Sequence, residues 1–425
     1  MKKPTVYFLI ILSLLISCGR ERSRPFPTFM RPFPTEAYYV DGIHGDDNYT
    51  GNKNKPIKTI AELNLRLQKK ASSVYFTSGQ VFNGTLIFNG INGPYKISSL
   101  GGGRAVINGG NSEAIKIENC RNIWITNLDL KGNGRKEGNI TNGLSLTHSQ
   151  NMVIDQIYAA GFQKSGVDIY DCKEIKVNKV TASNNGFSGI NVMGSERSHS
   201  GKIMISYCKA ENNPGDPAIL DNHSGNGILV GVSDSVLIDH CTATNNGWDM
   251  PRQGNGPVGI WTWESSHVTI QYCISYKNKT SKGGKDGGGF DLDGGVTNSV
   301  IQYCLSFNNQ GAGYGLFQYS GASNWSGNVV RYCISINDAT TTEGSGSIFL
   351  WNGSGDDNQL ADCKVYSNIA FNSLSPVISY ENASAHKNFT FRNNIFIGTG
   401  KAEASLKAGS SFIRNWWWNT KSKKH

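Results

Sequence analysis

A short pattern of alternating apolar and variable residues recurs at intervals of roughly 30 residues through most of the chain. Its copies are Gly143-Leu-Ser-Leu, Gly166-Val-Asp-Ile, Gly189-Ile-Asn-Val, Gly227-Ile-Leu-Val, Gly259-Ile-Trp-Thr, Gly289-Phe-Asp-Leu, Gly315-Leu-Phe-Gln and Ser347-Ile-Phe-Leu. The alternation has the period of a β-strand, and a second apolar strand follows each copy. Units of this length bury their apolar faces only by stacking on one another. We therefore predict an all-β protein, a right-handed parallel β-helix.

Cysteine and asparagine recur with the same period. The cysteines end the second strand of successive repeats, and the asparagines follow them: Cys208, Cys241, Cys273, Cys304, Cys333 and Cys363, then Asn212, Asn245, Asn278, Asn308, Asn337 and Asn368. Residues at one place on every coil stack about 4.8 Å apart. Earlier repeats carry Leu128, Ile157 and Val180 at the cysteine place. We therefore predict a buried thiol ladder without disulfides and an amide ladder in the turns, both structural.

The N-terminal residues predict export and a lipid anchor. Lys2 and Lys3 precede an apolar stretch, Val6 to Ile16, that is too short to span a bilayer stably. Leu15-Ile16-Ser17-Cys18 resembles the bacterial lipobox, which implies cleavage before Cys18 and lipid attachment to its sulfur. We expect a protein anchored to a bacterial membrane, at the outer membrane, the cell surface or the periplasmic face.

The chain divides into five predicted segments. They are a signal peptide (1–17), a tether (18–37), an N-terminal cap with the first coils (38–110), the β-helix (111–400) and a C-terminal cap or tail (401–425). Within the cap, Thr59 to Gln68 is predicted to be helical and to cover the first core layer.

Composition and charge bear on the partners. The chain has 50 glycines and only 12 prolines, which favours many tight turns. Its formal net charge of +9 favours an anionic partner, such as an anionic glycan or acidic lipid. The sequence shows no nucleic-acid-binding motif. We expect a monomer that binds an anionic polysaccharide or oligosaccharide and no nucleic acid.

The glycine-led strands present an unusual outer face. Every second residue of such a strand points outward, where polar side chains are usual, yet here aromatic residues flank two carboxylates. Exposed aromatic patches mark binding surfaces, and sugar rings stack on aromatic faces. The predicted substrate-binding residues are Trp261, Trp263, Phe317, Asp168, Asn191 and Trp351. In the alternative reading, loops fold over this face and the aromatic residues are merely buried.

Three long insertions, 209–226, 242–258 and 275–288, precede these strands and bring charged residues to the same side. Function tends to reside on loops that a rigid scaffold holds in place. The predicted catalytic residues, from the loops and the neighbouring strands, are Lys285, Asp291, Asp293, Arg252, His223 and Tyr319.

Parts of the chain resemble exported bacterial β-helix proteins that act on polysaccharides, the pectate-lyase-like superfamily. This resemblance is carried by Tyr38-Tyr39-Val40-Asp41, Gly45-Asp46-Asp47 and Pro56-Ile57-Lys58-Thr59-Ile60. Gly284 to Phe290 and Cys304 to Asn309 are similar to family 9 polysaccharide lyases, in which an aspartate at the place of Asp286 helps to bind calcium. That family's further calcium aspartates have no counterpart between Gly311 and Gln318. The resemblance implies Asp286 as a Ca²⁺ ligand, and the alternative is a different calcium site formed by Asp286, Asp291 and Asp293. No cofactor is expected to be required.

We expect β-elimination on a uronic-acid-containing glycan, by a polysaccharide lyase or an oligosaccharide dehydratase. The reaction needs a cation that neutralises the uronate and a base that removes the C5 proton. Arg252, Lys285, His223 and Tyr319 are the candidates for these roles. Two alternatives stay open: a glycoside hydrolase that uses Asp291 and Asp293 as paired carboxylates, and a non-catalytic glycan-binding lipoprotein at the cell surface.

Overall fold

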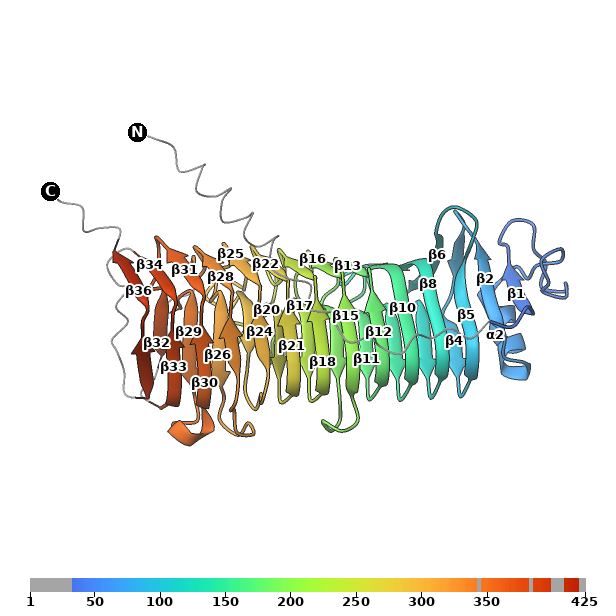
Figure 1. Cartoon of the computed structure of the whole chain (residues 1–425). Helices are drawn as coiled ribbons and strands as arrows, with labels where there is room; N and C mark the ends of the chain where they lie inside the picture. Colours follow the sequence, from blue (N-terminus) through green and yellow to red (C-terminus); the bar gives the residue numbers. More distant parts are fainter. Residues whose placement is uncertain (1–32, 342–344, 382–384, 399–408, 420–425) are drawn as a thin grey trace. The chain divides into compact units, whose positions relative to one another are not determined.

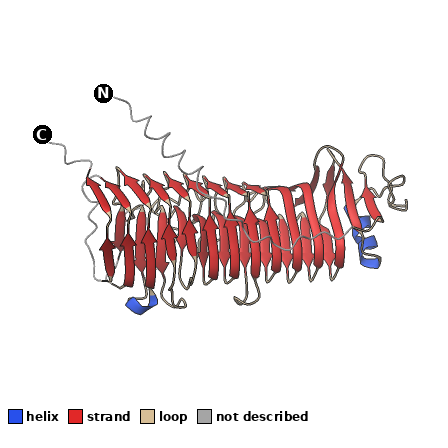
Figure 2. Ribbon diagram, viewed as in Figure 1, coloured by secondary structure: helices blue, strands red, loops and turns tan. Residues whose placement is uncertain are grey.

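The structure is a computed structural model that describes residues 33–341, 345–381, 385–398 and 409–419 (Figure 1). The unit Phe33–His425 is one compact body. Parallel strands stack coil upon coil along one axis, and only short helices interrupt them (Figure 2). The predicted signal peptide and Cys18 lie outside the described residues. Within the described residues, no helix has the length and apolar character needed to cross a membrane.

The glycine-led strands form an eleven-stranded parallel sheet, here called the site sheet. Its strands are β4 (Leu86–Asn89), β7 (Ile115–Glu118), β9 (Leu144–Thr147), β11 (Ser165–Tyr170), β14 (Ser188–Met193), β17 (Asn226–Gly231), β20 (Val258–Trp263), β23 (Gly288–Leu292), β26 (Tyr314–Gln318), β29 (Ile348–Asn352) and β32 (Ile378–Glu381).

The other strands form a 25-stranded sheet that consists of two ladders, joined by two long strands that belong to both. The joining strands are β8 (Arg121–Gly132) and β10 (Gln150–Ala160). The first ladder adds β1 (Ala37–Val40), β2 (Ser73–Thr77), β5 (Asn92–Leu100), β12 (Lys173–Asn178), β15 (Gly201–Ser206), β18 (Asp234–Asp239), β21 (Ser266–Gln271), β24 (Val300–Gln302), β27 (Val329–Arg331), β30 (Ala361–Tyr366), β33 (Lys387–Arg392) and β35 (Ser410–Ile413). The second ladder adds β3 (Val81–Asn83), β6 (Ala105–Gly110), β13 (Thr181–Ser183), β16 (Lys209–Glu211), β19 (Thr242–Thr244), β22 (Ile274–Tyr276), β25 (Leu305–Phe307), β28 (Ile334–Ile336), β31 (Ile369–Asn372), β34 (Ile395–Gly398) and β36 (Trp416–Asn419).

The predicted helix near the N-terminal end is α2 (Ile60–Lys69). Thr59 caps it, because its side chain accepts the N–H of Glu62, and Ile60, Leu63 and Leu67 are buried in the main core. The second, very short helix is η1 (Asp357–Gln359), in a loop. A one-sided apolar helix placed beside the first strands covers core that would otherwise face water.

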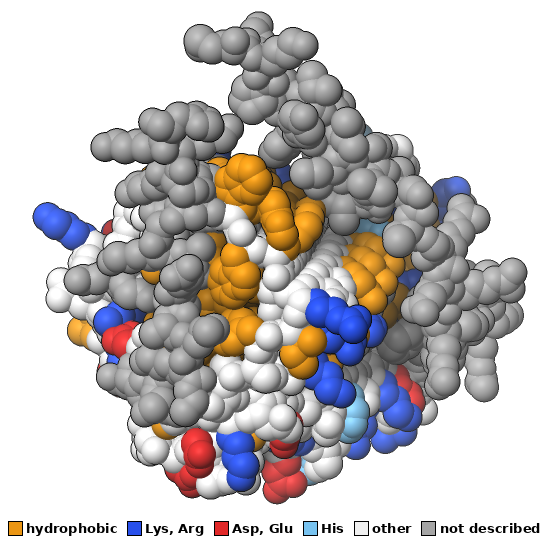
Figure 3. All heavy atoms as spheres, turned by 60° about the vertical axis from the view of Figure 1, so that its left-hand side comes forward, with side chains coloured by type: hydrophobic (Ala, Val, Ile, Leu, Met, Phe, Trp, Pro, Cys, Tyr) orange, Lys and Arg blue, Asp and Glu red, His pale blue; other side chains and the backbone are white. Residues whose placement is uncertain are grey.

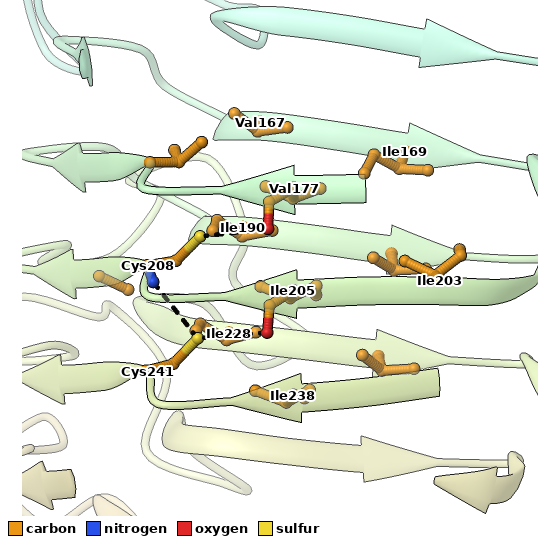
Figure 4. Packing of buried hydrophobic residues seen from close by; sticks show 14 of the residues in the cluster. Val167, Ile169, Val177, Ile190, Ile203, Ile205, Cys208, Ile228, Ile238 and Cys241 are labelled. Atoms are coloured by element: carbon orange, nitrogen blue, oxygen red, sulfur yellow. Dashed lines mark hydrogen bonds between the residues drawn. The ribbon is translucent and has the colours of Figure 1, made fainter. Parts of the chain in front are cut away.

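The thiol ladder is present and structural. Each amide N–H of Cys208 and Cys241 points to the sulfur of the next cysteine at 3.4 Å, and both side chains pack among the apolar side chains of neighbouring coils (Figure 4). The described cysteines are buried free thiols. Cys363 corrects the prediction, because it lies within β30 opposite Phe389. In that coil Asn368 occupies the turn and accepts the N–H of Cys333 at 2.9 Å.

The amide ladder is also present, but most of its members differ from those predicted. Each residue of this ladder donates its backbone N–H and its side-chain amide to the buried side-chain oxygen of the next member, one coil later. The members, in order, are Asn185, Asn213, Asn246, Asn278, Asn309 and Asp338. Of the predicted series, Asn278 belongs to this ladder. Asn212, Asn245, Asn308 and Asn337 lie one residue earlier, at a corner where φ is positive, which asparagine tolerates.

The strand register corrects one predicted repeat. Tyr314 pairs with Phe290 and Ile348, and its buried hydroxyl donates to the carbonyls of Cys304 and Ile334. Gly313, rather than Gly315, is therefore the leading glycine of this coil. A Cβ on Gly313 would lie 2.6 Å from Ser335 Oγ, so a larger residue would collide with the turn. Asp291 consequently faces Gly315, and Phe317 faces Trp351.

Candidate functional site

A cavity of about 730 Å³ opens on the outer face of the site sheet, over β20, β23, β26 and β29. The loops that precede β17, β20 and β23 supply further lining residues. The cavity is lined by Asn222, His223, Arg252, Asn255, Gly256, Val258, Trp261, Trp263, Lys285, Asp286, Asp291, Asp293, Phe317, Tyr319, Ser345, Phe349, Trp351 and Glu381. Of the outward aromatic residues, Trp261, Phe317 and Phe349 are buried, as the alternative interpretation expected, and Trp263 and Trp351 are half-buried at the cavity.

Trp261 and His223 lie together in one wall, with ring centroids 4.8 Å apart. The indole N–H of Trp261 donates to Asn226 Oδ1 at 3.1 Å, so the amide nitrogen of Asn226 faces His223 Nδ1 at 3.0 Å. Nδ1 therefore accepts, and the neutral ring carries its proton on Nε2. Burial, with the charge of Arg252 nearby, lowers the pKa of His223 to about 4. At neutral pH this histidine is an uncharged hydrogen-bond donor.

Phe317, Phe349 and Trp351 form the opposite wall. The ring of Phe317 meets those of Phe349 and Trp351 edge-on, with centroids 5.3 and 6.3 Å away. β26 and β29 pair Phe317 with Trp351 in register, whereas the predicted alignment had paired Phe317 with Phe349. Trp261 on β20 and Trp351 on β29 lie three coils apart, and the polar floor lies between the two walls.

Asp291 is the most buried acid of this floor. It is 3% exposed, its Oδ1 has no hydrogen-bond partner, and Gly315 faces it on the next strand. A Cβ on Gly315 would lie 2.9 Å from that oxygen, so the missing side chain leaves room for the carboxyl group. Desolvation, followed by the charges of Asp293 and Asp286, raises the pKa of Asp291 well above its usual range. We infer that Asp291 keeps its proton at neutral pH.

Asp293 and Asp286 complete the acidic cluster. Burial raises the pKa of Asp293 to about 7, against the hydrogen bond that its Oδ1 accepts from Gly294 N–H at 2.7 Å. Burial also raises the pKa of Asp286, to about 6, although its Oδ2 accepts the N–H of Gly256 at 2.7 Å. Position 256 must be glycine, because a Cβ there would lie 2.1 Å from the Lys285 carbonyl oxygen. Desolvation thus raises the pKa of all three acids, and it raises that of Asp291 well above the usual range.

The cavity rim carries the charged and hydroxyl groups. Lys285 Nζ lies 3.7 Å from Glu381 Oε1, and Arg252 lines the cavity beside it. Desolvation, with the charges of Glu264 and Asp293, raises the pKa of Tyr319. Glu264 is itself fixed by Arg197, whose Nη2 lies 2.8 Å from its Oε2. Tyr319 therefore stays a neutral phenol at the pH where the acids titrate.

All six predicted catalytic residues line the cavity, together with Trp261, Trp263, Phe317, Trp351 and Asp286. Asp168 and Asn191 do not line it. They bond to each other at 2.8 Å, and the fully buried Leu229 separates their coils from that of Trp261.

Sequence reasoning did not assign the remaining lining residues, among them Asn222, Asn255, Ser345 and Glu381. Phe349 carried a signal, since it occupies an outward position of the repeat. Glu381 also has a sequence signal, because β32 continues the site sheet and pairs Glu381 with Trp351.

The acidic cluster does not have the arrangement of a calcium site. Calcium takes six to eight oxygen ligands, usually several carboxylates around one point. Across the described part of the chain, no three or more His, Cys, Asp or Glu side chains are placed to share one ion. Asp286, the ligand that the resemblance implied, uses one of its two oxygens to accept the Gly256 N–H. These residues do not fit the ion that the resemblance implied.

The sequence comparisons identify the fold. Residues 218–365 match the family described as right-handed beta helix region. No curated protein matches the sequence. The chain is therefore a right-handed parallel β-helix, as the repeat predicted.

Solved structures with this fold differ in what they do. A GH136 lacto-N-biosidase from Eubacterium ramulus is 15% identical, with a TM-score of 0.63, over 90% of this chain and 68% of that one. The A-module of the Azotobacter vinelandii mannuronan C-5 epimerase AlgE4 is 11% identical, with a TM-score of 0.52, over 89% and 97%. PfbA, a surface adhesin of Streptococcus pneumoniae, is 12% identical, with a TM-score of 0.54, over 89% and 88%. At these identities the likeness shows the fold alone, and function has to be argued from the site.

Proposed function

We propose that this protein is a glycoside hydrolase that cleaves a glycan in the aromatic-walled cavity. The observation that carries the proposal is the acidic cluster, in which three carboxyl groups line one cavity, burial raises the pKa of Asp286 and Asp293 towards neutral pH, and Asp291 keeps its proton. Glycoside hydrolysis needs one carboxylic acid and one carboxylate on the two sides of the bond. Groups whose surroundings push their pKa values apart supply that pair.

Asp293 is assigned as the proton donor and Asp286 as the carboxylate. With a pKa of about 7, Asp293 holds a proton near neutral pH and can still release it to the glycosidic oxygen. Asp286, with a pKa of about 6, is assigned the ionised role and either activates a water molecule or attacks the anomeric carbon. Asp291 remains neutral, because its pKa lies well above its usual range. Trp351, which is part-buried at the cavity, offers an aromatic face for a sugar ring, whereas Trp261 is only 4% exposed and supports the opposite wall.

The bases required for β-elimination are poorly placed in this cavity. The Nδ1 lone pair of His223 faces Asn226 and its Nε2 carries the proton, so the ring donates rather than abstracts. The raised pKa of Tyr319 disfavours the phenolate that would remove a C5 proton. The protonation states of His223 and Tyr319, the two predicted bases, therefore favour hydrolysis over elimination.

β-Elimination on a uronate glycan remains the second candidate, because Arg252 and Lys285 both line the cavity and the chain has a net charge of +9. Two cations beside a sugar-sized cavity could neutralise a uronate carboxylate. An ionised Asp286 would then act as the base. The third candidate is a glycan-binding protein without catalytic activity. The experiment that separates hydrolysis from elimination also tests this candidate.

The test is incubation with a panel of neutral and uronate-containing oligosaccharides. Hydrolysis is expected to yield new reducing ends without the ultraviolet absorbance of an unsaturated uronate. Growth of that absorbance would replace hydrolysis with elimination, and binding without any product would leave a lectin-like protein. Asp293→Asn is expected to abolish turnover, whereas Asp357→Asn, at an exposed acid in η1, serves as the matched control.

We also propose that the chain is exported as a monomer and lipid-anchored through Cys18. The support is the lipobox-like sequence before Cys18. Mass spectrometry of protein from a bacterial membrane fraction is expected to show an N-terminal lipidated cysteine, and Cys18→Ser should release the chain from the membrane. An unmodified Cys18 in the mature chain would contradict the proposal.

A further inference from the structure

The outer face of the second ladder changes character along the β-helix. In β16 and β19 its outward residues are Lys209, Glu211, Thr242 and Thr244. From β22 to β36 every outward residue is apolar, and these twelve residues form the apolar strip: Ile274, Tyr276, Leu305, Phe307, Ile334, Ile336, Ile369, Phe371, Ile395, Ile397, Trp416 and Trp418.

The strip faces away from the core. Between each outward pair lies an inward residue, such as Ser275, which is fully buried and donates to the Gly289 carbonyl at 2.7 Å. Ile274 is 39% exposed, Ile395 36%, Trp416 50% and Trp418 45%. In-register pairing places the strands about 4.8 Å apart, so six strands give a surface about 24 Å long. Figure 3 brings the C-terminal end of the β-helix forward and shows hydrophobic side chains gathered there, with basic side chains beside them.

The edges of the strip are basic and aromatic. Lys277, Arg331, Arg392 and Arg414 flank it, and the six outward segments, 271–277, 302–308, 331–337, 366–372, 392–398 and 414–419, contain no Asp or Glu. The rings of Tyr272, Tyr303 and Tyr332 stack along one edge at 5.0 Å, and the Arg331 guanidinium lies 5.7 Å from the centroid of Tyr332. In the sequence, Lys421, Lys423 and Lys424 follow shortly after Trp418.

We propose that the apolar strip docks on the surface of an anionic lipid bilayer. Aliphatic residues suit acyl chains, Trp and Tyr prefer the headgroup level, and Lys and Arg at the edges attract anionic lipids. A glycan is a poorer match, because the strip lacks the amides and carboxylates that bind sugar hydroxyls. A second copy is also a poorer match, because two-fold packing of this face would bring the same basic edges together. The inference stands independently of the proposed hydrolase.

The experiment uses the unit Phe33–His425, which contains every sheet and the main core and lacks the predicted signal and lipid site. It is sedimented with vesicles of phosphatidylcholine, alone or mixed with phosphatidylglycerol. We expect binding to the mixed vesicles, weaker in high salt. Trp416→Ser should lower the partition coefficient about tenfold. Trp248→Ser, at a tryptophan 47% exposed outside the strip, should leave it unchanged.

Ile274→Ser, at the other end of the strip, provides a second variant that does not touch the last coil. It should also weaken binding, and circular dichroism checks that each variant keeps the fold. Absence of binding to the mixed vesicles would overturn the proposal, as would equal losses for the Trp416 and Trp248 variants. Dimers that dissociate in both strip variants, without vesicle binding, would overturn it in favour of a second copy.

Discussion

Two buried polar clusters lie only a few residues apart in this β-helix, and they are built on opposite principles. In the amide ladder, Asn246, Asn278 and Asn309 each accept two hydrogen bonds at Oδ1, and each side-chain amide donates to neighbouring oxygens. In the acidic cluster, Asp291 leaves Oδ1 without a partner, and burial raises the pKa of all three acids.

The difference separates scaffold from site. A buried polar network that is fully paired adds rigidity, whereas a buried carboxyl oxygen without a partner, such as Asp291 Oδ1, costs stability and persists where it serves a function. The amide ladder recurs from coil to coil, whereas the three acids belong to a single coil. The unpaired oxygen of Asp291, which periodicity does not reveal, distinguishes the site from the scaffold.

The largest expected effect is on turnover. Asp293→Asn removes the proposed proton donor but keeps its shape, so kcat should fall about 10³-fold. Circular dichroism should show an unchanged fold. Retention of more than a tenth of the activity would remove Asp293 from the proposed pair.

Asn278→Ala tests the scaffold cluster in the same manner. It removes the acceptor for Asn246 and a donor to Asn309, so the free energy of unfolding should fall by about 3 kcal/mol, measured by urea denaturation. The kcat of the folded fraction should not change. A large loss of kcat with normal stability would show that the ladder contributes to the site.

The pH profile reports the charges around the acids. Activity should be bell-shaped, because Asp286 must be ionised and Asp293 protonated, with limbs near about 6 and about 7. The charge of Glu264 raises the pKa of Asp293, so Glu264→Gln should move the alkaline limb to lower pH. If the acid limb moves and the alkaline limb does not, Asp286 is the proton donor and Asp293 is the carboxylate.

Asp291→Asn should increase stability at high pH. The folded-state pKa of Asp291 is raised, so its contribution to stability is complete below about 4 and is lost as pH rises above that value. Asparagine does not ionise, so Tm at pH 8 should rise by about 1–3 °C and stay the same at pH 4. A lower Tm at pH 8 would mean that the carboxylate is stabilised in the folded protein.

The smallest expected effect is that of metal removal. EDTA should leave activity unchanged, because the acidic cluster does not fit calcium. Loss of activity that Ca²⁺ restores, in wild type and not in Asp286→Asn, would reinstate the calcium site that the resemblance implied.

Much of the fold could be predicted from the sequence, because each coil repeats one pattern and stacking is the only way to bury it. The leading glycine of one coil could not be found this way. Gly313 and Gly315 both fit the local pattern, and only the pairing of Tyr314 with Phe290 selects Gly313. Likewise Cys363 keeps the spacing of the thiol ladder, while Asn368 keeps its position.

The sequence by itself determined that the glycine-led strands turn Trp261, Asp291 and Asp293 outward, because successive side chains of a strand point to opposite faces of the sheet. Only the tertiary structure decided that Asp168 and Asn191 lie apart from the cavity and that Glu381 joins it, since these depend on which coils become neighbours. Burial in the folded chain also raised the pKa of the three acids. The pKa of a carboxyl group depends on the solvent and charges around it, which the chain assembles only when it is folded.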